Sequence, residues 1–134
     1  MEKSVDWQFD SYMQEIFQMK EVDIREYSPL ALAYIGDCIF DLVIKSLVMN
    51  EGNKQVQKMH KETSSYVQAS AQSKMMRTIQ EHLTDQSITD YRRATGFEAL
   101  MGYLYLKKDW KRLLDLVKIG LCSVSDRSAL KEEE

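Results

Sequence analysis

The chain has 134 residues, 44% of them hydrophobic, with 5 glycines, 1 proline and a formal net charge of −3. This length suits one domain, and this hydrophobic fraction excludes a chain that is disordered throughout. The mild negative charge gives no indication of a nucleic-acid partner, although a local basic patch is compatible with it.

Helical periodicity recurs along the chain and predicts an all-α fold, because no segment shows the sustained two-residue alternation of a strand. A first helix is expected at about 5–20. Ser28 and Pro29 mark the start of a second helix, since serine can cap free N–H groups and proline fits the first helical position. This helix should run to about Met49, before "NEGN". Further helices are expected at 54–66, 69–83, 90–107 and 110–121.

The cysteines and the N-terminus indicate the compartment. Cys38 and Cys122 are far apart in sequence and form neither a metal-binding pair nor a disulfide framework. Cys38 lies within an apolar helix and is expected to be a small core residue. The N-terminus has no apolar signal segment, and charges interrupt the stretch that is long enough to span a membrane. We therefore expect a soluble cytoplasmic protein without a membrane partner.

Two acids interrupt the apolar stretch "LALAYIGDCIFDLVIKSLVM", which covers residues 30–49. Asp37 and Asp41 lie one helical turn apart, and Asp37 follows the small residue Gly36. A lone buried carboxylate is costly unless it is paired, hydrogen-bonded or metal-bound. A structural pair for Asp37 and a metal site both remain open, and Asp41 is expected nearer the rim.

A second apolar helix, "TGFEALMGYLYL", also carries one central acid, Glu98. Gly102 follows one turn later, and a glycine inside a helix favours close approach by another backbone. If the two helices cross, Asp37 meets Glu98, and the two carboxylates repel unless a cation lies between them. Ligands that are all oxygen favour Mg²⁺, or Mn²⁺, over zinc.

Three motifs in order carry a family resemblance: "LALAYIGD", "HKETSSYVQASAQ" and "YRRATGFEALMGYLYL". They resemble Mini-ribonuclease III, the compact branch of the ribonuclease III family that has no double-stranded-RNA-binding domain. The resemblance implies a homodimer with the helical fold of ribonuclease III endonuclease domains. Residues 1–134 would form one catalytic domain with a family-like core at about 29–107.

The resemblance also implies an activity, the Mg²⁺-dependent cleavage of double-stranded RNA, with the maturation of large-subunit ribosomal RNA as the usual task. It assigns catalysis and metal binding to Asp37 and Glu98, with Asp41 as an outer-shell candidate. Longer family members carry further acids where this chain has Ala33 and Thr95. Two alternatives remain: an RNA-binding module with weak or lost cleavage, and a helical interaction protein whose acids are structural.

Binding of RNA requires basic groups near these acids. The candidates are Lys54, Lys58, His60, Lys61, Lys74, Arg77, Arg92 and Arg93. Lys54, Lys58 and Lys61 recur at spacings of four and three residues and so share one helical stripe. Such a stripe is equally typical of a solvated helix face.

The junction between the fourth and fifth helices is short. The resembling family carries a longer basic, glycine-bearing loop here, whereas this chain has only "TDQSITD". We predict a break in the chain between Asp85 and Ile88. If no break exists, the chain is a shortened variant with weaker RNA affinity.

Overall fold

The computed structural model describes residues 5–82 and 96–133, with side chains described in 9–81 and 96–124. Its helices are α1 (Val5–Phe17), the short 3₁₀ helix η1 (Ile24–Glu26), α2 (Pro29–Asn50), α3 (Val56–Val67), α4 (Ala69–His82), α6 (Phe97–Leu106) and α7 (Trp110–Glu133). No strand occurs among the described residues, so the predicted all-α class is confirmed.

The start of α2 follows from its first residues. The Ser28 side chain accepts a hydrogen bond from the backbone N–H of Ala31 at 3.1 Å, and Pro29 occupies the first helical position, as predicted. The helix ends at Asn50, and the chain turns through Gly52, whose φ of 136° is difficult for a residue with a side chain.

Two helix boundaries differ from the prediction. The last helix was expected to end near 121, but α7 continues to Glu133. Gly120 lies inside it, and a single helical glycine costs only about 1 kcal/mol, so it does not end a helix that is otherwise free of breakers. The third helix begins at Val56, so Lys54 lies in the turn before it and not on the predicted helical stripe.

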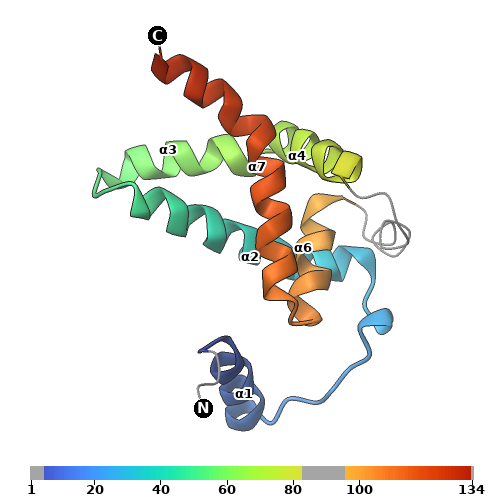
Figure 1. The fold of residues 1–134 in the computed structure, drawn as a ribbon. Helices are drawn as coiled ribbons and strands as arrows, with labels where there is room; N and C mark the ends of the chain where they lie inside the picture. Colours follow the sequence, from blue (N-terminus) through green and yellow to red (C-terminus); the bar gives the residue numbers. More distant parts are fainter. Residues whose placement is uncertain (1–4, 83–95, 134) are drawn as a thin grey trace.

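The core lies where α2 crosses α6 and where α7 packs on α4 (Figure 1). Phe40 of α2 meets Phe97 of α6 edge to face, with ring centroids 4.7 Å apart. The largest fully buried side chains come from four helices: Phe40, Ile44, Met75, Ile79, Leu100, Met101, Leu104 and Leu113. This core holds α2, α4 and α6 against one another.

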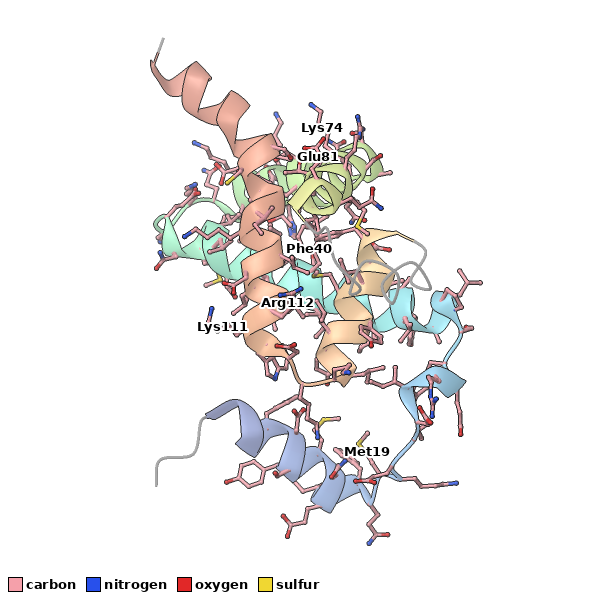
Figure 2. All side chains as sticks on the ribbon, turned by 45° about the vertical axis from the view of Figure 1, so that its right-hand side comes forward. Met19, Phe40, Lys74, Glu81, Lys111 and Arg112 are labelled. Atoms are coloured by element: carbon pink, nitrogen blue, oxygen red, sulfur yellow. The ribbon has the colours of Figure 1, made fainter. Side chains whose placement is uncertain are left out.

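Several apolar side chains remain outside this core. Cys38, expected in the core, is exposed, because it lies on the α2 face that no other part of the described chain covers. The α1 helix lies at the end of an extended stretch through η1 (Figures 1 and 2), where Asp10 and Met13 line a pocket together with Tyr105 and Leu106 at the end of α6. None of the helices, within the residues that are described, is long and apolar enough to cross a membrane.

Candidate active site

The site begins with two glycines at the crossing of α2 and α6. A Cβ atom placed on Gly36 would overlap the backbone oxygen of Glu98, and one placed on Gly102 would overlap the backbone oxygen of Leu32. The two backbones are therefore in direct contact. The sequence predicted such a contact at Gly102, and the structure shows that Gly36 makes the reciprocal one.

This crossing brings two carboxyl groups together. Asp37 follows Gly36 on α2, and Glu98 lies in the first turn of α6. The pKa of Glu98 is raised above its ordinary value, first by burial and then by a side-chain hydrogen bond with Asp37. Such a bond requires a proton between the two groups, so in the absence of a cation the pair resists carrying two negative charges.

A third side chain, Gln72 of α4, completes the group and was missed by the sequence analysis. Its Nε2 atom donates to Oε2 of Glu98 at 3.2 Å and to the backbone oxygen of Val67 at 2.9 Å. The bond to Glu98 favours the charged carboxylate and partly opposes the rise in pKa. A signal was present in the sequence, because Gln72 shares a helical face with the buried Met75 and Ile79.

Asp41, the outer-shell candidate, has a different partner. Its carboxylate lies 3.0 Å from the Lys45 ammonium, one turn further along α2, and both side chains are partly exposed. Asp41 therefore takes part in a surface ion pair, one helical turn from Asp37.

The basic candidates fall into three groups. Lys54 is held by Glu62 at 2.8 Å and by Glu51 at 3.0 Å, and these hydrogen bonds raise its pKa. Its charge is therefore already balanced. The other candidates with described side chains are Lys58, His60 and Lys61 on α3, and Lys74 and Arg77 on α4, all of them exposed except Lys74, which is half-buried.

Lys74, Arg92, Arg93 and the predicted break in the chain complete the comparison with the sequence predictions. In Figure 2, the side chain of Lys74 extends outward from α4. Arg92 and Arg93 lie outside the described residues, as does the predicted break between Asp85 and Ile88.

The donor atoms available for a metal ion are few. No group of three or more histidine, cysteine, aspartate or glutamate side chains is placed to hold a metal within the described residues. Two adjacent carboxylates remain, Asp37 and Glu98. This set suits Mg²⁺, which is commonly held by one or two carboxylates together with waters and substrate phosphate oxygens.

Comparison with known proteins gives one consistent family. The family model for the ribonuclease III domain matches residues 30–109. A Mini-ribonuclease 3 from Clostridium tetani is 34% identical over 133 residues, covering 84% of this chain and 87% of that protein. One from Thermoanaerobacter is 33% identical over 118 residues, covering 73% and 83%. One from Enterococcus faecalis is 32% identical over 117 residues, covering 71% and 89%.

Each alignment has more positions than it has residues of this chain. The 118 positions aligned with the Thermoanaerobacter protein cover 73% of 134 residues, or about 98 residues, so about 20 positions have no residue here.

Proposed function

Because the chain belongs to the ribonuclease III family of endoribonucleases, we propose that it hydrolyses double-stranded RNA with Asp37 and Glu98 as its catalytic carboxylates. The observation that carries this assignment is the crossing of α2 and α6, which packs Gly36, the neighbour of Asp37, against the backbone of Glu98. We treat the whole chain, 1–134, as one catalytic domain.

The proposed cofactor is Mg²⁺, with Mn²⁺ as a substitute. Asp37 and Glu98 would hold it, because a divalent cation offsets the repulsion between two adjacent carboxylates. Such an ion lowers the pKa of coordinated water and stabilises negative charge on phosphate oxygens. The ion pairs seen among described residues engage other carboxylates, such as Asp41 and Glu62, which leaves the Asp37–Glu98 charge for the cation.

The two carboxylates have separable roles in this proposal. Asp37 is exposed and can be reached from solvent, whereas Glu98 is partly buried and fixed by α6 and by Gln72. Glu98 therefore defines where the cation is held, and Asp37 faces the side from which a phosphodiester approaches. Both must be ionised at the moment of binding, because a protonated carboxyl group is a poor ligand for a hard cation.

Contact with the RNA backbone is assigned to exposed basic side chains. Lys58 and Lys61 of α3 and Arg77 of α4 are exposed and can neutralise phosphates, with Lys74 as a less exposed candidate. His60 of α3 is also exposed and can donate a hydrogen bond to a phosphate oxygen. Lys54 is a weaker candidate because two carboxylates already balance its charge. Arg92 and Arg93 remain candidates on the strength of the sequence alone, as does Asp41 for an outer-shell role.

The outer face of α2 supports a homodimer. Leu30 is 83% exposed and Tyr34 81%, and Leu42, Met49 and Cys38 follow on the same side of the helix. Large apolar side chains gathered on one exposed helix face mark an interaction surface, and here the ion pair of Asp41 and Lys45 lies among them. A second copy of the chain would cover it and would provide two sites, one for each strand of a duplex. Such an obligate interface should bury about 2,000 Å² or more.

The biological setting follows from the family alone. We propose that the substrate is a precursor of large-subunit ribosomal RNA and that the enzyme acts in the cytoplasm. Mini-ribonuclease 3 is the name given to the relatives that match.

A cleavage assay tests this function. A labelled RNA duplex should be cut in Mg²⁺ and remain intact in EDTA, and Asp37→Asn or Glu98→Gln should each lower the rate at least about 100-fold without unfolding the chain. Binding of the duplex without any cleavage in Mg²⁺ would favour the alternative of an RNA-binding module. If neither RNA nor Mg²⁺ binds, the acids are structural and the protein is a helical interaction module.

A further inference from the structure

The junction of α3 and α4 places one uncharged side chain against the proposed metal ligand. Gln72 donates both hydrogens of one amide nitrogen, one to Oε2 of Glu98 at 3.2 Å and one to the Val67 oxygen at 2.9 Å. We propose that Gln72 is a positioning residue that fixes the rotation of the Glu98 carboxylate for divalent-cation binding. This inference rests on the proposed function.

The orientation of the amide is determined by its partners. Both neighbours of the Gln72 nitrogen, a carboxylate oxygen and a backbone carbonyl oxygen, can only accept hydrogen bonds when Glu98 is ionised. The reversed amide would set an oxygen against two acceptors, so the NH₂ group must face them. Gln72 therefore acts as a donor at this site.

A second hydrogen bond and the packing of α4 hold the Gln72 amide in place. The Val67 carbonyl belongs to the last turn of α3, where carbonyl groups lack partners within the helix. Gln72 satisfies this carbonyl, and its own backbone N–H donates to the backbone oxygen of Gln68, the residue between α3 and α4. Met75, fully buried three residues later, holds the same face of α4 against the core. The side chain thus links the fixed junction of α3 and α4 to Glu98 of α6.

The neutrality of the donor distinguishes this contact from the ion pairs that Asp41 and Glu62 make. Asp41 is paired with Lys45, and Glu62 with Lys54, so those carboxylates are oriented and neutralised together. A lysine beside Glu98 would compete with a divalent cation for the same charge. A glutamine orients the carboxylate and leaves its charge intact, as expected of a group that supports a metal ligand.

The test measures Mn²⁺ binding to the full chain in the absence of RNA, by electron paramagnetic resonance of the free ion. Gln72→Met keeps a similar volume without a donor, and Gln80→Met, at an exposed site on the same helix, is the matched control. We expect Gln72→Met to weaken Mn²⁺ binding about 10- to 100-fold and the control to leave it unchanged. Duplex affinity in EDTA should be the same in both, since the residue acts on the cation and not on the RNA.

Two further variants keep the test decisive. Gln72→Asn retains an amide if Gln72→Met does not fold, but its shorter side chain loses one of the two contacts, so Mn²⁺ binding should weaken as well. Gln72→Lys retains a donor and adds a charge, so Mn²⁺ binding should fall at least as far as in Gln72→Met.

Wild-type Mn²⁺ affinity in the folded Met or Asn variant would overturn the positioning role. If Glu98→Gln is inactive in that case, the proposed function stands and only the role of Gln72 is wrong. If Glu98→Gln cleaves the duplex normally, the proposed function is wrong as well.

Discussion

The two sides of α2 differ sharply, although the sequence makes both apolar. The inner side carries Gly36, Phe40 and Ile44 and is buried against α6 and the rest of the core. The outer side carries Leu30 and Tyr34, which are among the most exposed apolar residues of the described chain. Asp37 lies between the two sides. One helix thus packs the domain with one face, presents an interaction surface with the other, and carries the site where they meet.

The largest expected effect comes from the inner side. Gly36→Ala places a methyl group where the Glu98 backbone oxygen lies, so α2 and α6 must separate. We expect the free energy of unfolding to fall by about 3 kcal/mol, at the upper end of the usual cost of overpacking. Urea denaturation measures it. Ser46→Ala, at an exposed position on the same helix, is the control and should change stability by less than about 0.5 kcal/mol. Equal stability of Gly36→Ala and the wild type would show that the crossing is looser than described.

The helix α2 also shows how much of the fold can be predicted from the sequence. The start of α2 was predictable because Ser28 and Pro29 act locally, and the crossing was predictable because Gly102 costs helix stability for which close packing is the usual reason. The ends of helices were less predictable, since Gly120 resembles a terminator yet lies inside α7.

Side-chain partners were the hardest to predict. Cys38 was placed in the core because its neighbours in sequence are apolar, but exposure depends on which face another element covers. Gln72 was missed because its partners, Val67 and Glu98, come from a neighbouring turn and from a helix 26 residues away. Periodicity identifies a face of a helix, and only the tertiary fold identifies what faces it.

The outer side of α2 gives the second prediction. Leu42→Glu places a charge on the apolar face, and burying it in a dimer without a partner is costly. We expect the dimer dissociation constant to rise at least about 30-fold, which is about 2 kcal/mol, with little change in monomer stability. Analytical ultracentrifugation measures it, and Leu114→Glu, an equally drastic change at an exposed site on α7, is the control. A wild-type chain that is monomeric at micromolar concentration would refute the dimer itself.

The third prediction concerns pH and the pair formed by Asp37 and Glu98 where α2 crosses α6. The pKa of Glu98 in the folded chain is raised above its ordinary value of 4.5, mainly by burial and then by Asp37. The folded state therefore binds this proton more tightly than the unfolded state does. Its contribution to stability is complete below pH 4.5 and is lost as pH rises through the raised pKa.

Thermal unfolding in EDTA tests this dependence. The melting temperature of the wild type should fall relative to that of Glu98→Gln as pH rises from 4.5 towards neutrality, because the variant has no proton to lose. Mg²⁺ should reverse the fall at neutral pH, since it binds the ionised pair and stabilises the folded state. Parallel curves for the two proteins would mean that Glu98 is not perturbed.

The smallest effect is expected at the rim, where Asp41 and Lys45 form an ion pair at 3.0 Å. Both side chains are partly exposed, at 38% and 49%, so solvent screens the attraction and the pair should contribute only about 0.3–0.5 kcal/mol. Lys45→Met keeps the apolar stem and removes the charge, and urea denaturation with and without 0.5 M salt should show a loss of this size that disappears in salt.

The variant also tests Asp41 as an outer-shell group. Freed from its lysine, Asp41 adds negative charge one turn from Asp37, so the Mg²⁺ concentration for half-maximal cleavage should fall if Asp41 supports the cation. If Asp41 serves only the surface pair, stability changes slightly and the Mg²⁺ requirement does not.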